Sequence, residues 1–242
     1  MHQRNQYQSF AAEAPDLPLF LQPWYLDAVC EGGTWDAALV QKNGRAVAAL
    51  PYFLKQKLGW RYVTMPQLCK QMGPYLLPEY RELKWEMRLY EELIGQLPRG
   101  LAAFEQNFNY QVNNWLPFYW KGFKQTTLYS YVLSLESSEE LIFKNIEKNY
   151  RQKIRAAETR LTVQDDLPLS ELHRLVGMSF ERQGLESPIS FPFLQKLYAA
   201  LSEHHACKLF FASDPVTGQL HSAALLAWDN TSAYYLMSGD DP

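Results

Sequence analysis

Two stretches of equal length share one pattern: GRAVAALPYFLKQKLGWRYVTM (44–65) and GQLHSAALLAWDNTSAYYLMSG (218–239). Each begins at a turn glycine, continues into a small-residue apolar strand, and reaches an aromatic-headed strand sixteen residues later, at Trp60 or Tyr234. An apolar strand also precedes each glycine, WDAALVQ in the first case and CKLFFAS in the second. Turn glycines between such runs are typical of hairpins, so each stretch predicts a three-stranded antiparallel meander. Two copies of one unit predict a duplicated fold.

Helical patterns accompany both meanders. In the second half, residues 169–184 and 191–204 carry apolar side chains at helical spacing and follow a short strand, RLTVQ (160–164). In the first half, LFLQPWYLDAV leads into the meander, and ELKWEMRLYEELIGQL predicts a strong helix before the strand LAAFEQNF. The element order predicts an α/β (α+β) fold with mixed, mostly antiparallel sheets.

Composition limits the classes of function. The 242 residues are 47% hydrophobic, and the net charge of −3 gives no global basic field, so a polyanion could only be bound by a local patch. Cys30, Cys69 and Cys207 are an odd, scattered set that favours a reducing compartment. No run approaches the roughly 18 apolar residues of a membrane span. We therefore expect a cytoplasmic protein, without DNA binding or membrane insertion.

The order of elements resembles that of the N-acetyltransferase (GNAT) superfamily. LPLFLQPWYLDAVC, ALPYFLKQKLGWRYVTMP and NWLPFYWKGFKQTTLYSYVLSL are similar to segments of bacterial acyltransferases that carry two GNAT-like domains in tandem, relatives of the Fem-type peptidoglycan aminoacyltransferases. The resemblance covers the chain from about Leu17 onward. It implies a first GNAT-like domain in residues 1–120, on the acceptor side, and a second in 121–242, on the acyl-donor side. The two would be joined near Trp120 to Gln125.

The resemblance also implies acyl-CoA (acetyl-CoA) as co-substrate and places its site. In GNAT domains the pyrophosphate is bound by a glycine-containing loop and a helix N-terminus directly after the fourth strand. SAYYLMSG (232–239) looks like that strand, which assigns Leu236, Met237 and Ser238 to cofactor binding. The sequence stops soon afterwards, so we expect that the chain is truncated and its second domain incomplete. The equivalent loop of the first domain, 65–80, holds three prolines, which lack N–H donors, so that domain is expected to be degenerate.

A basic stripe is the second candidate site. The segment SSEELIFKNIEKNYRQKIRAAE predicts one helix from Ser137 to about Glu158, started by a capping box of Ser137 and Glu140. Helical spacing then places four cations on one face, and they are the predicted substrate-binding residues: Lys144, Lys148, Arg151 and Arg155. They could bind the phosphates of CoA, a nucleotide-linked sugar or tRNA in a cleft between the domains. Alternatively, pairs such as Glu140 with Lys144 and Glu147 with Arg151 make an ordinary solvated face.

Other motifs are weaker. The rings of NNWLPFYWKGF (113–123) could line a groove for a sugar, peptide or pantetheine arm, but core packing is the more ordinary interpretation. His204, His205, Cys207 and His221 follow no standard ligand spacing, so no metal is predicted. His173 is expected to be a hydrogen-bonded core residue. No nucleophile, P-loop or dinucleotide motif is present, and the catalytic residues stay unassigned.

Three functions remain open. The first is an N-acyltransferase that moves an acyl group from acyl-CoA to an amine of a small-molecule, sugar or peptide acceptor, including a cell-wall or polysaccharide precursor. The second is an aminoacyl-tRNA-dependent transferase of the Fem type, and the third is a non-catalytic binding module. Fem-type enzymes often insert a long helical hairpin for tRNA, whereas only one helix is predicted here and the net charge is acidic. Both features favour CoA over tRNA.

Overall fold

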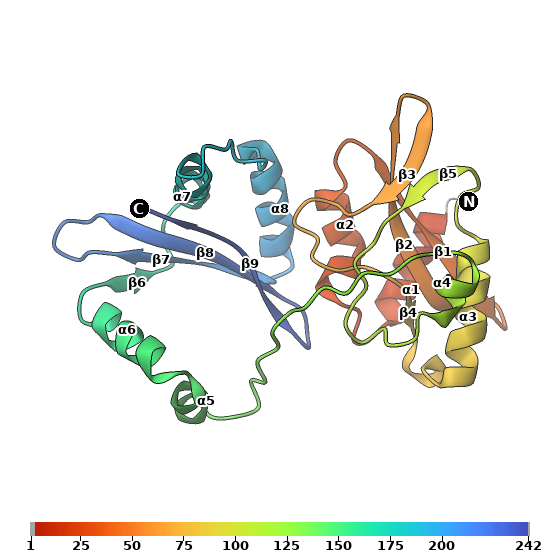
Figure 1. The fold of residues 1–242 in the computed structure, drawn as a ribbon, viewed down its shortest axis with the longest axis horizontal. Coiled ribbons are helices and arrows are strands. Elements are labelled where there is room, and N and C mark those ends of the chain that lie inside the picture. The colour runs from red at the N-terminus through yellow and green to blue at the C-terminus, as the bar shows by residue number, and fades with distance from the viewer. Residues whose placement is uncertain (1–2, 242) are drawn as a thin grey trace. The chain divides into compact units, whose positions relative to one another are not determined.

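The computed structural model describes residues 3–241, and these form two compact units (Figure 1). The first unit contains residues up to 124 together with 189–207 and 227–236. The second contains 125–188, 208–226 and the residues from 237 onward. The chain therefore returns to the first unit twice after leaving it. The predicted boundary at residue 120 is not decided by this division and stays a prediction.

The first unit is built on a five-stranded sheet. Its order is β1-β2-β3-β5, and a short strand, β4, also pairs with β2. The strands are β1 (Thr34–Lys42), β2 (Arg45–Lys57), β3 (Trp60–Thr64), β4 (Tyr75–Leu76) and β5 (Leu101–Phe104). β1, β2 and β3 pair antiparallel, as the meander predicted, whereas β5 lies parallel to β3. The sheet is therefore mixed.

Helices of the first unit are short, and two of them are single 3-10 turns. They are α1 (Gln3–Glu13), η1 (Leu19–Leu21), α2 (Pro23–Val29), η2 (Pro78–Tyr80), α3 (Leu83–Gly95), α4 (Leu116–Trp120) and α8 (Phe191–Glu203). α8 packs against α2, so a helix from the second half of the chain is part of the first unit. The expected helices at 82–97 and 191–204 are confirmed.

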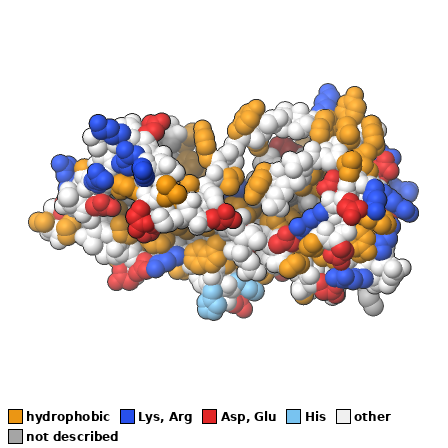
Figure 2. All heavy atoms as spheres, turned by 90° about the horizontal axis from the view of Figure 1, so that it is seen from below, with side chains coloured by type: hydrophobic (Ala, Val, Ile, Leu, Met, Phe, Trp, Pro, Cys, Tyr) orange, Lys and Arg blue, Asp and Glu red, His pale blue; other side chains and the backbone are white. Residues whose placement is uncertain are grey.

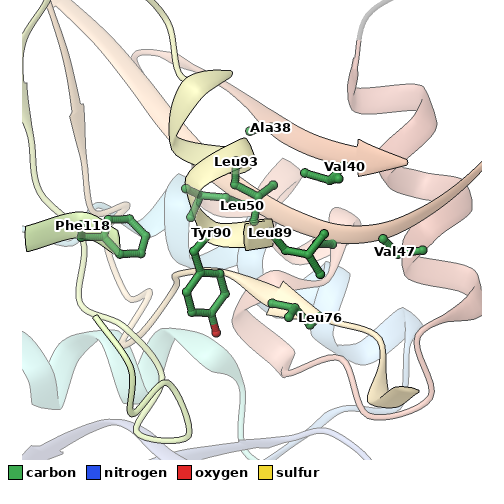
Figure 3. Packing of buried hydrophobic residues seen from close by; sticks show 10 residues of the cluster. Ala38, Val40, Val47, Leu50, Leu76, Leu89, Tyr90, Leu93 and Phe118 are labelled. Carbon is green, nitrogen blue, oxygen red and sulfur yellow. The ribbon is translucent and has the colours of Figure 1, made fainter. Parts of the chain in front are cut away.

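A compact apolar cluster holds α3 and α4 against this sheet (Figure 3). Leu50 of β2 and Leu89 and Leu93 of α3 are completely buried. Phe118 of α4 closes the cluster, with its ring centroid 4.9 Å from that of Phe108. Burying a Leu or Phe side chain contributes roughly 1.5–3 kcal/mol, so this cluster supplies much of the stability of the unit.

Helix α1 was not predicted, because its sequence, QRNQYQSFAAE, has only two large apolar side chains. Both are buried: Tyr7 is edge-on to Trp35, and its hydroxyl donates to the carbonyl of Leu21 at 2.6 Å. Arg4 also forms an ion pair with Asp27 of α2. Tertiary contacts, rather than helix periodicity, therefore fix α1.

The second unit has a four-stranded sheet in the order β6-β7-β8-β9. The strands are β6 (Thr162–Gln164), β7 (Cys207–Ser213), β8 (Leu220–Trp228) and β9 (Ala233–Asp240), and the helices are α5 (Glu139–Asn145), α6 (Lys148–Glu158) and α7 (Leu169–Glu181). β6 pairs antiparallel with β7. The ends of β7, β8 and β9 nearest residues 207, 227 and 236 are counted with the first unit. The predicted fold class, mixed α/β with mostly antiparallel sheets, is confirmed.

Residues 125–138 contain no helix or strand and lie exposed along their whole length. Their apolar side chains are nearly free of contacts, with Tyr129 94% and Leu133 65% exposed.

In the described residues no helix is long and apolar enough to cross a membrane.

A single carboxylate ties the β8–β9 turn to the first unit. Asp229 Oδ1 accepts hydrogen bonds from the backbone N–H groups of Thr231 and Ser232, and from the Thr231 hydroxyl, at 2.8–2.9 Å. Asp229 Oδ2 accepts from the backbone N–H of Leu19 at 2.9 Å and from the Tyr234 hydroxyl at 3.1 Å. The neighbouring rings of Phe20 and Tyr234 lie 4.6 Å apart. One side chain therefore both shapes the turn and fixes it to η1.

Replacing this carboxylate should destabilise the protein. Asp229→Ala leaves the half-buried donors of Leu19 and Tyr234 without an acceptor, so the free energy of unfolding should fall by about 2–4 kcal/mol. The matched control is Asn230→Ala, because Asn230 is exposed in the same turn and should change stability by less than about 0.5 kcal/mol. Urea unfolding followed by circular dichroism measures both. Equal midpoints for the two variants would contradict this role of Asp229.

Candidate functional site

The predicted cofactor residues lie on β9, which is the last strand in its sheet. Leu236 and Met237 are buried, and Ser238 is half-buried. Among the described residues, no strand pairs with the outer edge of β9. What this strand can offer a ligand is therefore mainly its backbone N–H and C=O groups. The assignment of these three residues to cofactor binding stays a prediction.

The C-terminal end of β9 is fixed against helix α7. The Asp240 N–H donates to Ser179 Oγ at 2.9 Å, and the Ser179 hydroxyl donates to the Asp240 carbonyl at 3.3 Å. Gly239 is buried between them, and a Cβ atom there would lie 2.2 Å from the backbone nitrogen of Val176. Only a residue without a side chain allows the strand to approach the helix so closely.

The pairing of β9 with β8 is irregular. The Asp229 N–H donates to the Ser232 carbonyl at one end, and the Asp241 N–H donates to the His221 carbonyl at the other. From Ser232 to Asp241 is one residue more than from His221 to Asp229. Between these two hydrogen bonds the register of β8 against β9 therefore shifts by one residue.

The basic segment does not form the single helix expected from its sequence. α5 ends at Asn145, Ile146 is extended with ψ 141°, and α6 begins at Lys148. The capping residue is Ser138, not Ser137; its hydroxyl oxygen accepts from the Leu141 N–H. Hydrogen bonds from the Glu140 N–H and the Ser138 side chain hold the pKa of the Glu140 carboxyl below its usual value. The hydrophobic period continues through the break, which is why the pattern did not reveal it.

The break gives the four predicted cations different environments. The Arg151 guanidinium donates through Nη1 to the carbonyl of Lys144 at 2.6 Å and to that of Ile146. It thereby satisfies the free carbonyls at the C-terminal end of α5. Arg155 lies over the ring of Phe143, 5.4 Å from its centroid, while Lys144 and Lys148 are exposed. Lys144 and Lys148 are consequently the members of the stripe best placed to meet an anion.

The solvated ion pairs expected on this face are not formed. Within the described residues, no ion pair joins Glu140 to Lys144 or Glu147 to Arg151. Figure 2 shows Lys and Arg side chains gathered on the surface at the left of that view. An unpaired positive surface is compatible with a polyanionic ligand, although the substrate-binding role of the stripe stays a prediction.

A shallow depression that the sequence did not reveal lies between α6 and the β7–β8 turn. It has a volume of about 490 Å³, and its charged or titratable lining residues are Lys153, Arg160, Asp214 and His221. Backbone N–H groups of Thr217 and Val216 bind the Asp214 carboxylate and lower its pKa. Because these residues come from two distant segments, no local motif marks them.

The aromatic segment 113–123 divides between two roles. Phe118 packs in the core with Phe123, as the ordinary interpretation expected. Tyr119 and Trp120, on the same helix, are more than half exposed. The segment therefore anchors α4 and also presents rings to solvent.

The three cysteines are unsuited to nucleophilic catalysis. Burial raises the pKa of the Cys30 thiol to about 12, and it raises the pKa of the Cys69 and Cys207 thiols as well. None is bonded in a disulfide. At neutral pH these groups are thiols rather than thiolates, and only the thiolate is a good nucleophile.

His204 and His221 have different surroundings. His204 stacks on Trp24 at a centroid distance of 4.2 Å, and His221 lines the depression beside Asp214. In the part of the chain that the structure describes, no three His, Cys, Asp or Glu side chains are placed to hold a metal ion.

Comparison with known proteins agrees with this architecture. Residues 144–242 match the family model for the acetyltransferase (GNAT) domain. Over the whole chain the fold is similar to the crystal structure of FemX, with 15% identity, a TM-score of 0.69, and coverage of 100% of this chain and 80% of that one. A tandem GNAT protein from the clavulanic acid biosynthesis pathway is also matched, at 12% identity and a TM-score of 0.39, covering 95% and 72% of the two chains. No curated protein matched.

These findings are two likenesses. Residues 144–242 are similar to the acetyltransferase (GNAT) domain. The fold of the whole chain is similar to that of FemX. The resemblance predicted from the sequence is confirmed to this extent.

The close approach of β9 to α7 can be tested with two glycines. Gly239→Ala should lower the free energy of unfolding by about 2–4 kcal/mol, because its Cβ would overlap backbone atoms that cannot move away. Gly177→Ala is the control: Gly177 lies in α7 with nothing near its added Cβ, so this change should stabilise by about 0.5–1 kcal/mol. Thermal or urea unfolding compares them. If Gly239→Ala were as stable as Gly177→Ala, the close contact between β9 and α7 would be wrong.

Thiol reactivity should follow burial. Native protein at pH 7.5 should react slowly with Ellman's reagent, since all three thiols have raised pKa values and stay protonated. Unfolding in guanidinium should expose all of them to rapid reaction. In the folded protein, the reaction of Cys30 should speed up by about tenfold for each unit of pH and should level off only near its pKa of about 12. Rapid, stoichiometric labelling of one native thiol at pH 7.5 would reveal an activated cysteine and contradict the protonated state assigned to all three.

Proposed function

We propose that this protein is an N-acyltransferase that moves an acyl group from acyl-CoA to an amine of a small-molecule, sugar or peptide acceptor. The observation that carries the proposal is the match of residues 144–242 to the GNAT acetyltransferase domain. A cell-wall or polysaccharide precursor is included among the acceptors. Free thiols and the use of acyl-CoA favour a cytoplasmic location.

The proposed chemistry is direct transfer. The acceptor amine attacks the thioester carbonyl, and the tetrahedral intermediate collapses to an amide as its C–S bond breaks. The amine loses a proton, and the departing CoA thiolate gains one, so the products are the amide and free CoA thiol. Backbone N–H groups at the open edge of β9, near Leu236 to Ser238, would polarise the carbonyl as it gains negative charge. The protonated state of the three cysteines argues against an acyl-cysteine intermediate. In this mechanism the protein positions the acyl donor and the amine, and it forms no covalent intermediate with the acyl group.

The phosphates of the donor would be met by the basic segment. Lys144 and Lys148 are the freest of Lys144, Lys148, Arg151 and Arg155, because Arg151 already donates to carbonyl groups and Arg155 covers Phe143. We therefore propose that Lys144 and Lys148 carry the largest electrostatic share of phosphate binding among these four. Charge-assisted bonds to phosphate are the strongest polar contacts such a surface can offer.

A Fem-type transferase that uses aminoacyl-tRNA is the second candidate, and one observation favours it. The segment expected to be a single helix is a pair, α5 and α6, joined by an extended residue. The expectation of a single helix was one of two reasons for preferring CoA, and that expectation is wrong. The other reason, the acidic net charge of −3, still favours CoA over tRNA. The whole-chain similarity to FemX adds to this candidate as a matter of fold. A non-catalytic binding module is the third.

Ligand binding separates these candidates. If the first is right, titration calorimetry should detect acetyl-CoA, and Lys148→Gln should weaken binding by about tenfold because one charge-assisted contact is lost. Lys121→Gln, an exposed lysine of the first unit, should leave the affinity unchanged. Transfer to a panel of amines is followed by the release of free CoA thiol.

Other outcomes would decide against the whole proposal or against one part of it. Filter binding to aminoacyl-tRNA without affinity for acetyl-CoA would support the Fem-type transferase. Binding of acetyl-CoA that Lys148→Gln and Lys121→Gln weaken equally would retain the donor but remove Lys148 from its site. Affinity for acetyl-CoA without turnover on any amine would support the binding module.

A further inference from the structure

The hairpin between β2 and β3 has an unusual tip. Leu58 and Gly59 are its two turn residues, with φ of 51° and 84°, and they are flanked by the paired residues Lys57 and Trp60. Positive φ at both positions is the geometry of a type I′ turn, which favours Asn-Gly. A leucine here adopts a conformation that is costly for a bulky apolar side chain. The side chain gains nothing in return within the fold, because it is 90% exposed.

The tip is apolar, and cations lie on the strands behind it. Trp60 is 68% exposed next to Leu58. Lys55 and Lys57 lie on the same face of the hairpin as Trp60, and Arg61 lies on the other face. Within the described residues, none of these three cations forms an ion pair. The hairpin extends away from the rest of the first unit, at the top of Figure 1.

We propose that this hairpin docks on an anionic membrane surface. Tryptophan is favoured at the interface between lipid and water, since its ring is apolar and its N–H can remain hydrated. Leu58 enters the acyl boundary beside it, and the three cations on the hairpin strands meet the anionic headgroups. Each cation close to such a surface adds a comparable increment of attraction. The contact is peripheral, needs no spanning helix, and is independent of the proposed acyl transfer.

Charge complementarity selects lipid over the other partners an apolar tip could have. A protein partner for two apolar side chains would need a pocket, and the three cations would then require matching carboxylates. A neutral apolar surface would leave the three cations without any partner. An anionic bilayer offers an apolar acyl boundary to the tip and anionic headgroups to the cations on the strands behind it.

Sedimentation with vesicles tests this contact. The wild-type protein should bind vesicles of phosphatidylglycerol and phosphatidylcholine at least tenfold more tightly than vesicles of phosphatidylcholine alone, and raised salt should weaken binding. Leu58→Asn and Trp60→Thr should each reduce binding about fivefold or more, and Lys57→Gln should reduce it only for the anionic vesicles. Leu58→Asn suits the turn better than leucine, so it keeps the protein folded.

The control and the contrary results are equally direct. Val216 is 92% exposed in the turn between β7 and β8, so Val216→Asn removes a similar apolar side chain and should bind like the wild type. Brominated lipid should quench tryptophan fluorescence, and Trp60→Phe should remove that part of the quenching. A wild-type protein that stays in the supernatant overturns the proposal. So does binding that ignores lipid charge, or a Leu58→Asn variant that binds as tightly as the wild type.

Discussion

The carboxylate of Asp229 is the interaction on which the organisation of the chain depends. It closes the β8–β9 turn with Oδ1 and binds the Leu19 N–H and the Tyr234 hydroxyl with Oδ2. The turn is consequently part of the first unit, although the strands on either side of it continue into the second. Without this acceptor, half-buried donors on η1 and on β9 would lose their partner. A charge that normally favours solvent is stable here because five donors surround it.

Much of the fold could be predicted because its signals are local. The first meander rests on turn glycines and alternating apolar residues, and both are read directly from neighbouring positions. The helix break at Ile146 could not be read in this way. Ile146 continues the apolar helical period through the break. The break is stabilised by Arg151, which lies further along the chain and donates to the carbonyls of Lys144 and Ile146. A pattern of side chains reports which face is apolar, but it does not report where the backbone hydrogen bonds stop.

Long-range contacts explain the other omissions. The hydrogen bond from the Leu19 N–H to Asp229 joins residues 210 positions apart. Helix α1 is polar along most of its length and is fixed by Tyr7, Phe10 and Arg4 against later elements. The depression between α6 and the β7–β8 turn likewise combines distant segments. In each case the decisive partner lies too far along the chain for any local window to include it.

In the proposed acyl-donor site, the side chains of β9 contribute to stability and its backbone groups contribute to ligand binding. Leu236 and Met237 are buried, so their side chains contribute to packing while the outer edge of the strand offers backbone groups. Backbone recognition suits a pantetheine arm, whose amides are the same whatever acyl group it carries. Selection of the acyl group and of the acceptor must then come from side chains outside this strand edge. Replacing Leu236 or Met237 would accordingly act on stability first, and the exposed Lys148 is the better position at which to change donor binding alone.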